Sequence, residues 1–365
     1  PSSSMVVPAD IPLSLIAPAV AAHVGSPSAC ALCAVSTPVA EMAAPTLRSA
    51  ADKLYVCGGS DRTGRPLSSV LRFDPAARVW KQLPAMSVRR CDCVAATLGG
   101  KVYVCGGWNL RRGERQPLRS AECFDPVACT WERLPDMCVA RWGFAAGVLR
   151  GRLYVCGGAN QDHSTLHCAE RYDPERNAWE LLPTMLEGRG GCVGSAVHGK
   201  LYVCGGVAAE WDDGLSCAEC FDPRAGVWEP LPGMSRVKWT AAAAAMEGRL
   251  YVCGGFTDEE REEAEEEEGA GGGGCPPLRL CERFDPARRT WEAMPAMSLP
   301  RGRCASAVLA GRLYVCGGTG PGGAALRSAE RFDPQRRAGA RGGWERLPPM
   351  PAGRQGVAMV SLGRP

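Results

Sequence analysis

The sequence predicts an all-β protein folded as a six-bladed β-propeller, which is a closed ring of four-stranded sheets. Three observations predict this fold. A unit of about 48 to 51 residues recurs six times, with one insertion in the fifth copy. Glycine and proline make up 74 of the 365 residues, about a fifth against roughly 12% in average proteins, which indicates many turns. The chain also ends on a segment that completes the first unit.

Five features recur in every unit and stay in register. Leu/Val-Tyr-Val-Cys-Gly-Gly comes first, followed by an aromatic-Asp-Pro turn and then by a tryptophan. A methionine lies six positions after each tryptophan, and a basic residue lies four positions after each methionine. The spacing from tryptophan to the first glycine of the next pair, as from Trp80 to Gly106, is the same in all five cases. A repeat of this period with turn residues at fixed places is typical of propeller blades.

Each unit is expected to form four short strands, which the second unit illustrates in order. Residues 90–98 form the innermost strand. Residues 102–105 are apolar throughout, as in a strand buried on both faces. The glycine pair then suits a crowded position or one that needs a positive φ. The third strand ends at Asp125-Pro126 because proline cannot donate to the sheet, and Trp131 opens the fourth strand.

The two ends of the propeller complement each other. Residues 354–362 align with the innermost strands of the other units, and the chain ends before a Tyr-containing strand follows. The first unit has the opposite defect, because residues 46–52 make a poor apolar strand. We therefore expect the C-terminal strand to complete blade one, which removes the free sheet edges.

The double glycine, the Tyr-Asp-Pro-type turn and the spaced tryptophan resemble the kelch repeat family. The resemblance covers residues 53–362, which is most of the chain. It implies a propeller of kelch repeats. A shared fold does not by itself imply a shared function.

Two segments lie outside the regular repeat. Residues 1–52 are rich in Ala, Ser and Pro and are expected to be a linker or disordered, and they are too few to hold the BTB and BACK domains that precede many kelch propellers. An insertion at 258–274 enlarges the fifth unit. Its residues 258–268 carry a net charge of −8, so the rest of the chain carries +11. The insertion is either a tolerated surface loop or a competitor of acidic partners for the basic propeller.

Charge and hydropathy exclude several classes of protein. A net charge of +3 is too small a bias to indicate nucleic-acid binding. No apolar stretch is long enough to predict a membrane span. The first basic residue is Arg48, so no basic segment of a signal peptide precedes it. The 20 cysteines are therefore expected to be reduced thiols, which favours a cytoplasmic protein, with cytoskeletal and nuclear locations left open.

The repeated basic residues are the first candidate partner site. By the repeat symmetry they surround the mouth of the central channel, where guanidinium groups could bind carboxylates or phosphates. The alternative is packing, because a glutamate recurs in five units and could pair with them. The candidates are Arg90, Arg141, Arg189, Arg301 and Arg354, with Lys238 as the sixth basic residue.

Residues that do not repeat are the better candidates. Two loop sets, after the glycine pairs and after the methionines, are expected to share one face. The four tryptophans outside the repeat fall in these loops together with several arginines, and both residue types are enriched in interface hot spots. The alternative is that some pack inward. The candidates are Trp108, Trp142, Trp211, Trp239, Arg89, Arg111, Arg112 and Arg303.

The cysteines predict neither disulfides nor metal binding. One cysteine per unit occupies the same strand position, and neighbouring sheets stack about 10 Å apart, whereas a disulfide needs Cα atoms within about 7 Å. Two Cys-x-x-Cys pairs, 30/33 and 217/220, have no second pair at finger spacing. Cys91 and Cys138 are candidates for exposed, redox-sensitive thiols.

We expect no catalytic residue, no metal and no cofactor. The four histidines have no repeated carboxylate or serine partner, and the sequence contains no Gly-x-Ser-x-Gly elbow and no phosphate loop.

The resemblance implies a binding module. Kelch-like adaptors bring substrates to cullin-type ubiquitin ligases through a BTB domain, and several bind acidic motifs with arginines of the loop face. The first hypothesis is therefore a substrate-recognition propeller for a protein partner, and the BTB step would belong to a longer parent protein. The alternative is an actin-binding or cytoskeletal scaffold protein, because some kelch proteins bind actin.

Overall fold

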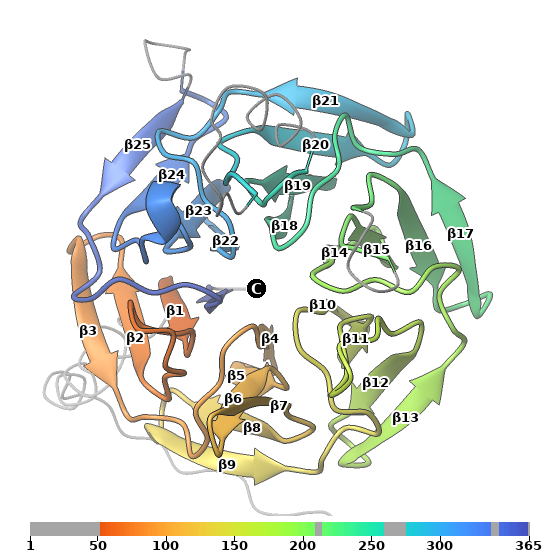
Figure 1. Cartoon of the computed structure of the whole chain (residues 1–365), viewed down its shortest axis with the longest axis horizontal. Helices are drawn as coiled ribbons and strands as arrows, with labels where there is room; N and C mark the ends of the chain where they lie inside the picture. The colour runs from red at the N-terminus through yellow and green to blue at the C-terminus, as the bar shows by residue number, and fades with distance from the viewer. Residues whose placement is uncertain (1–51, 209–213, 259–274, 337–342, 364–365) are drawn as a thin grey trace, which may run out of the picture. The chain divides into compact units, whose positions relative to one another are not determined.

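The computed structural model describes residues 52–208, 214–258, 275–336 and 343–363. All of them belong to one compact unit, Leu47–Pro365. They form six four-stranded antiparallel sheets around a central axis, which confirms the predicted six-bladed propeller (Figure 1). The predictions for residues 1–51, and for most of the insertion, lie outside the described residues.

The strands run from the axis to the rim in four rings. The innermost strands are β26 (Ala358–Leu362), β4 (Val94–Leu98), β10 (Ala145–Leu149), β14 (Val193–Val197), β18 (Ala242–Met246) and β22 (Ala305–Leu309). The second strands are β1 (Lys53–Cys57), β5 (Lys101–Cys105), β11 (Arg152–Cys156), β15 (Lys200–Cys204), β19 (Arg249–Cys253) and β23 (Arg312–Cys316). These twelve strands form the two inner rings of the propeller.

The third and fourth strands complete each blade. The third strands are β2 (Val70–Asp74), β8 (Ala121–Asp125), β12 (Ala169–Asp173), β16 (Ala218–Asp222), β20 (Cys281–Asp285) and β24 (Ala329–Phe332). The outer strands are β3 (Val79–Leu83), β9 (Thr130–Leu134), β13 (Ala178–Leu182), β17 (Val227–Leu231), β21 (Thr290–Met294) and β25 (Trp344–Leu347). A short hairpin, β6 (Trp108–Arg111) with β7 (Glu114–Pro117), and a 3-10 turn, η2 (Pro321–Gly323), lie in loops.

The C-terminal strand closes the ring, as predicted. Blade one has the strand order β26-β1-β2-β3, so its innermost strand comes from the end of the chain (Figure 1). β26 runs antiparallel to β1 and pairs Ala358 with Cys57 and Leu362 with Lys53. The blade therefore holds the two ends of the propeller together, and β1 has a partner on both edges.

The repeated tryptophans join neighbouring blades. Each indole Nε1–H donates to the carbonyl of a proline that follows the outer strand of the preceding blade, for example Trp131 to Pro84 at 3.0 Å. Trp80 makes the same bond to Pro348 across the closure, at 2.9 Å. The indole ring also packs on the aromatic residue of its own third strand, with ring centroids 5.1 Å apart for Phe124 and Trp131. The Trp of one blade and the Leu/Met-Pro motif of the preceding blade thus form one contact between the two blades.

The repeated cysteines are buried and free, as expected from their spacing. Cys57, at the end of β1, is wholly buried, and so are its counterparts in the other blades. Burial raises the pKa of Cys105 to about 12 and that of Cys204 to about 12, so these thiols stay protonated at neutral pH. The glycine after Cys57 is required by crowding, because a Cβ on Gly58 would lie 2.4 Å from the carbonyl oxygen of Arg90.

Within the described ranges, no helix is long and apolar enough to cross a membrane.

Candidate functional site

The two predicted loop sets lie together at one end of the strands. In blade two, the loop after the glycine pair meets the connector that precedes the innermost strand: Trp108 and Cys91 exchange backbone hydrogen bonds of 2.8 and 3.0 Å. Trp142 and Ala159 exchange the same pair of bonds in blade three. We call this end of the propeller the loop face. It surrounds one mouth of the central channel.

A closed circle of backbone hydrogen bonds surrounds that mouth. One residue per blade, two positions after the repeated base, donates its N–H to the carbonyl of the residue in the neighbouring blade at 2.7–3.0 Å. All six residues have positive φ, between 47° and 66°. We call this circle the mouth ring. Its members in bonding order are Asp92, Gly356, Arg303, Thr240, Gly191 and Gly143.

Two charged side chains of the mouth ring pair above Gly356. The Arg303 guanidinium donates to both carboxylate oxygens of Asp92, with Nε 3.2 Å from Oδ1. The Trp108 indole donates to Oδ2 of the same carboxylate at 2.8 Å. Burial opposes ionisation of Asp92, but the charge and hydrogen bonds of Arg303 outweigh it and lower the pKa of Asp92 below its usual value. Arg303, a predicted contact residue, is therefore largely engaged within the chain.

The five repeated arginines are inside the molecule and form the joints between blades. Arg90, on the connector from blade one, donates to the Gly106 and Ser120 carbonyls of blade two at 3.1 and 2.7 Å, and its Nη2 lies 3.1 Å from Oε1 of Glu122. The second oxygen of Glu122 accepts the N–H of Ser87, at 2.8 Å. The same joint recurs with Arg141–Glu170, Arg189–Glu219, Lys238–Glu282 and Arg301–Glu330.

Burial removes these arginines from the candidate contact surface. Arg90, Arg141, Arg189, Arg301 and Arg354 are each at most 5% exposed. The prediction of a guanidinium ring open to a partner is corrected on this point, because an arginine whose donors are used by the chain's own carboxylates and carbonyls has none for a ligand. The packing alternative is correct for four of the five arginines, which pair with the repeated glutamates.

Arg354 is the exception among the joints. It donates to the carbonyls of Gly58 at 3.3 Å and Ser69 at 3.1 Å. Leu71 occupies the place of the glutamate, and no carboxylate of the described residues pairs with Arg354. Its Nε is buried without a hydrogen-bond partner, and burial lowers its pKa. Pro351 stands where the other connectors supply an N–H to the glutamate, so the glutamate and its backbone donor are both absent from this joint.

Two of the non-repeated tryptophans are buried, so they are not available to contact a partner. Trp108 and Trp142 are 2% and 7% exposed and pack together with Cys91 and Ala159. Trp239 is half-buried, and Trp211 lies outside the described residues. The inward-packing alternative therefore holds for two of the four. Cys91 is also fully buried, so the expectation of an exposed thiol is wrong there, whereas Cys138 is exposed.

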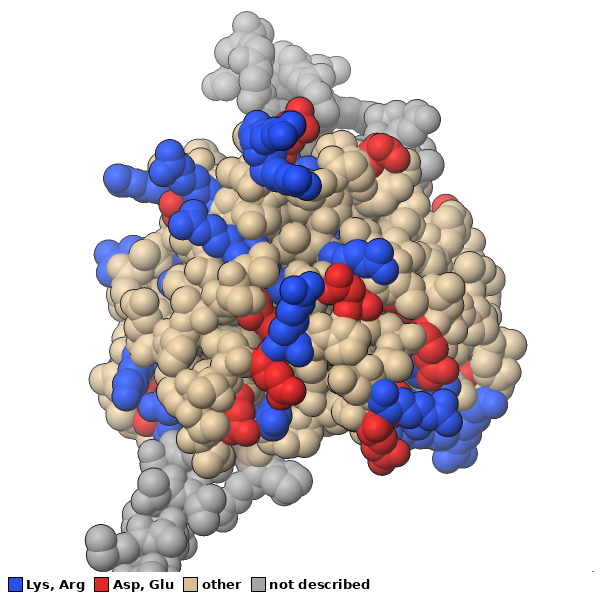
Figure 2. All heavy atoms as spheres, turned by 90° about the horizontal axis from the view of Figure 1, so that it is seen from below, with Lys and Arg blue, Asp and Glu red and all other residues tan. Residues whose placement is uncertain are grey.

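The exposed basic residues of the loop face come mainly from blades one and two. The β6–β7 hairpin presents Arg111 and Arg112, and Arg115 lies over the Trp108 ring with its guanidinium carbon 4.8 Å from the ring centroid. Arg89 is exposed on the connector before blade two, and Arg62 and Arg65 are exposed in blade one. In the side view of Figure 2, basic side chains form separate groups with acidic side chains between some of them.

Sequence reasoning missed the β6–β7 hairpin. Its two-residue turn, Arg112-Gly113, has φ of 55° and 88°, which is the geometry of the tight turn that suits twisted strands. A two-residue Xaa-Gly signal between Trp-Asn-Leu-Arg and Glu-Arg-Gln was present in the sequence. The hairpin gives Arg111 and Arg112 a fixed backbone, which lowers the entropy lost when they bind a partner.

The central channel forms a cavity with little polar chemistry. Its cavity has a volume of about 370 Å³ and is lined mostly by small residues of the six innermost strands and of the positions just before them. No charged side chain is among the described residues that line it. A second cavity of about 90 Å³ lies at the mouth ring and includes Asp92 and Arg303. Among the described residues, no cluster of three or more His, Cys, Asp or Glu could hold a metal ion.

Comparison with protein families identifies the repeat. The model described as the KLHDC2/KLHL20/DRC7 Kelch-repeats domain matches residues 33–206, and the Kelch motif model matches residues 188–235, 240–298 and 300–351. The chain belongs to the kelch-repeat family. Kelch propellers are generally binding modules, and the chain shares their blade architecture.

Curated kelch proteins match short stretches of the chain. An F-box/kelch-repeat protein of Arabidopsis thaliana is 36% identical over 91 residues, which cover 25% of this chain and 23% of the relative. Kelch-like protein 33 of Homo sapiens is 34% identical over 117 residues, 31% of this chain and 21% of the relative. Beta-scruin of Limulus polyphemus is 33% identical over 111 residues, 30% and 12% respectively. The aligned part spans less than a quarter of each of these relatives.

A solved structure supports the fold. The structure of YjhT superposes with a TM-score of 0.68 over 82% of this chain and 95% of that chain, at 16% sequence identity. At this identity the similarity concerns the kelch fold alone.

Proposed function

We propose that this kelch propeller binds a protein partner with an acidic motif through the loop face over blades one and two. The observation that carries the proposal is the group of exposed arginines on and around the β6–β7 hairpin. Arg111, Arg112 and Arg89 are exposed, and the guanidinium of Arg115 lies over the Trp108 ring. Guanidinium groups bind carboxylates in a planar, two-bond geometry.

The proposed contact set differs from the one that the sequence suggested. It keeps Arg89, Arg111 and Arg112 and adds Arg115, Arg62 and Arg65. Trp239 is left out because it precedes β18 of blade five, away from blades one and two. Trp108 is included only as the ring over which the Arg115 guanidinium lies. The five joint arginines are left out because they are buried.

In the parent protein the propeller would act as the substrate-recognition module of a kelch-like adaptor for a cullin-type ubiquitin ligase. Membership in the kelch-repeat family and the similarity to a kelch-like protein support this assignment. The link to the ligase requires a BTB domain supplied elsewhere in a longer chain. The location we propose is the cytoplasm, which suits both this role and the actin-binding alternative.

Affinity purification from cells with mass spectrometry tests the proposal. The bait is the whole propeller, compared with the variant Arg111→Ser/Arg112→Ser/Arg115→Ser. A matched control, Arg176→Ser/Arg224→Ser, removes exposed arginines from turns after the third strands of blades three and four. We expect a partner that is lost from the loop-face variant and retained by the control.

Two results would reject this function. The first is an identical partner set for all three baits, and the second is co-sedimentation of the propeller with actin filaments that the loop-face variant does not weaken. The second result would favour the scaffold alternative. All three proteins are first compared by thermal unfolding, because a changed melting temperature would make a lost partner uninterpretable.

A further inference from the structure

A second basic surface lies on the outer rim where blade one meets blade six. It consists of exposed or half-buried side chains at the outer strands β3 and β25 and next to them, and we call it the seam rim. Its members are Arg72, Arg78 and Lys81 of blade one and Arg331, Arg336, Glu345 and Arg346 of blade six. The seam rim is separate from the loop face, and the proposed function does not use it.

Blade one carries a lysine where the other blades carry a glutamate. The residue after the repeated tryptophan is glutamate in blades two to six, and in blade one it is Lys81. Lys81 stands directly opposite Arg72 in the pairing of β3 with β2. Two like charges in this position are destabilising. The described residues offer no carboxylate in an ion pair with Arg72 or Lys81.

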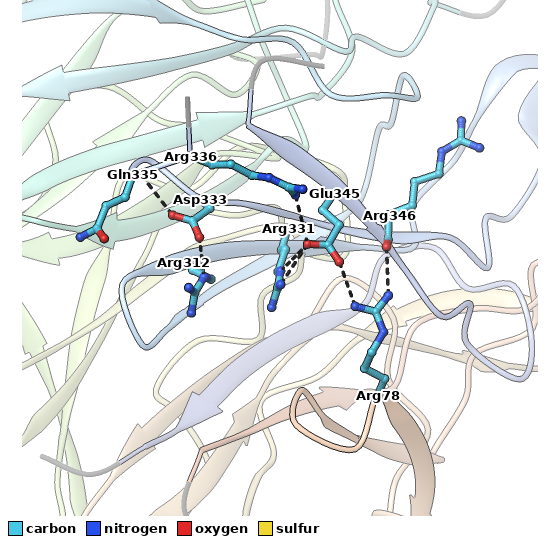
Figure 3. Close-up of polar contacts among 8 residues, drawn as sticks. All are labelled: Arg78, Arg312, Arg331, Asp333, Gln335, Arg336, Glu345 and Arg346. Carbon is cyan, nitrogen blue, oxygen red and sulfur yellow. Dashed lines mark hydrogen bonds and ion pairs between the residues drawn. The ribbon is translucent and has the colours of Figure 1, made fainter. Parts of the chain in front are cut away.

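On the neighbouring blade, three arginines share one carboxylate. Glu345 accepts from Arg78 Nη1 at 2.8 Å, from Arg331 Nη2 at 2.9 Å and from Arg336 Nη1 at 3.4 Å (Figure 3). Arg78 also donates to the backbone carbonyl of Arg346 at 3.4 Å. The hydrogen bond from Arg78 and the nearby guanidinium charges lower the pKa of Glu345.

The three guanidinium groups have more donors than Glu345 can accept. Each guanidinium has five N–H groups, whereas a carboxylate offers about four lone-pair sites. The side chains of Arg78 and Arg336 are 47% and 60% exposed, so their remaining donors face solvent. The side chain of Arg346 is exposed as well, and Figure 3 shows it extending away from the cluster.

The positive charge is concentrated at this rim. Six cations and one carboxylate give the seam rim a net charge of +5, almost half of the +11 carried outside residues 258–268. At the outer strands of blades three and five, one carboxylate pairs with one or two arginines. In blade three Arg171 pairs with Glu180, and in blade five Arg283 and Arg288 pair with Glu292.

We propose that the seam rim is a second interaction surface, which binds an acidic, extended segment of a protein partner. Glu345 already shows how a carboxylate sits among these guanidinium groups. Arg78, just before β3, reaches Glu345 of blade six. Lys81 holds in blade one the position that Glu345 holds in blade six, and Glu345 faces the following blade, so by the repeat Lys81 lies on the side of β3 away from blade six. An extended acidic segment lying along β3, about 17 Å at the usual rise per residue, would reach both sides.

Fluorescence anisotropy with a labelled peptide of alternating Glu and Ser tests the proposal. All proteins carry Arg111→Ser/Arg112→Ser/Arg115→Ser, so that the arginines of the β6–β7 hairpin do not contribute to peptide binding. In this background we compare Lys81→Glu/Arg336→Ser with the control Arg176→Ser/Arg224→Ser, in low salt. We expect the first pair to weaken binding about tenfold, since it removes three of the five net charges, and the control to change it by less than about twofold.

Three outcomes would overturn the proposal. They are no binding of the peptide in the loop-face background, equal loss in the rim and control variants, and tighter binding of an oligothymidine of equal charge than of the peptide. The last would assign the surface to nucleic acid. Failure here leaves the loop-face proposal intact, because that is judged by the partner lost from the loop-face variant in cells.

Discussion

Blade one differs from the other five blades in its charges but not in its shape. It keeps the glycine pair and the indole bond from Trp80 to Pro348, and its sheet has the same four-strand order. It lacks both repeated glutamates, which Leu71 and Lys81 replace. Backbone pairing, glycine and indole contacts therefore suffice to build a blade. The buried ion pair is an accessory, in agreement with the small net stability of such pairs relative to apolar packing.

The joint between blades six and one shows how the loss of a carboxylate is accommodated. Arg354 retains its carbonyl contacts, while Leu71 is buried among apolar residues of both blades. Pro351 removes an N–H that would have lost its acceptor. The site has thus changed at two positions in a consistent way, and the guanidinium remains as a buried charge without a carboxylate.

The largest effect is expected from removing the strand that distinguishes blade one. Truncation after Gly353 deletes β26, leaves β1 with a free edge and exposes the core contacts of Val357 and Met359. We expect loss of the cooperative melting transition or aggregation of the protein. Truncation after Gly363 is the control. A melt that is unchanged by the longer truncation would contradict closure by the C-terminal strand.

The second effect compares a joint that has its glutamate with the joint between blades six and one, which lacks it. Arg141→Met leaves Glu170 buried and unpaired and is expected to cost about 3–5 kcal/mol of unfolding free energy. Arg354→Met removes a buried charge that has no carboxylate, so we expect a change of less than about 1 kcal/mol. Urea unfolding of both variants measures the difference. Equal losses would mean that the carbonyl contacts, and not the ion pair, carry the joint.

The mouth-ring pair is expected to have an intermediate effect that depends on pH. Because the folded pKa of Asp92 is lowered, the pair contributes stability above the unfolded pKa of about 3.9 and loses it as the pH falls through the folded pKa. Asp92→Asn should cost about 2 kcal/mol at pH 7 and progressively less below about pH 4. A constant difference between the two proteins over this range of pH would argue against an ion-pair origin.

Restoring the missing carboxylate should give a smaller gain. In Leu71→Glu/Pro351→Ser the new glutamate can pair with Arg354 and accept the N–H of residue 351, as Glu122 does with Arg90 and Ser87. We expect the double variant to be more stable than Leu71→Glu by about 1 kcal/mol. Chemical unfolding of the two variants tests this. No difference would show that Pro351 is unrelated to the loss of the glutamate.

The smallest effect is expected from Lys81→Glu. This change replaces a like-charge pair with an opposite-charge pair opposite Arg72, which should stabilise the protein by a few tenths of a kcal/mol. The same change should weaken binding of acidic peptides at the seam rim. A stabilised variant with unchanged peptide binding would separate the two roles of Lys81, and it would count against the second surface.

The fold was accessible from the sequence because its signals repeat. Six copies of the Tyr-Val-Cys-Gly-Gly and Trp motifs predict six blades, and the order of the end segments predicts the closure. Identical motifs must occupy equivalent positions in the fold, so a strand assigned in one copy has to fit the other five copies as well. The β6–β7 hairpin was missed because it occurs once and its signal is a single Arg-Gly turn.

The candidate site was only partly accessible, for a physical reason. Sequence shows that an arginine such as Arg141 recurs, but recurrence is equally compatible with a binding ring and with packing. Only the tertiary structure places Glu170 within 2.7 Å of it and excludes solvent. The same holds for Trp108, whose indole is fixed by Asp92 from another loop.

The sequence by itself determined the blade, its number and the way the ring closes, because these depend on local patterns of apolar, turn and glycine residues. The tertiary structure decided which charged side chains are buried and paired inside the molecule and which remain free on its surface. Whether a side chain has a free donor depends on partners that are distant in the sequence, as Glu122 is from Arg90. No local pattern records such a contact, because it forms only when two blades pack against each other.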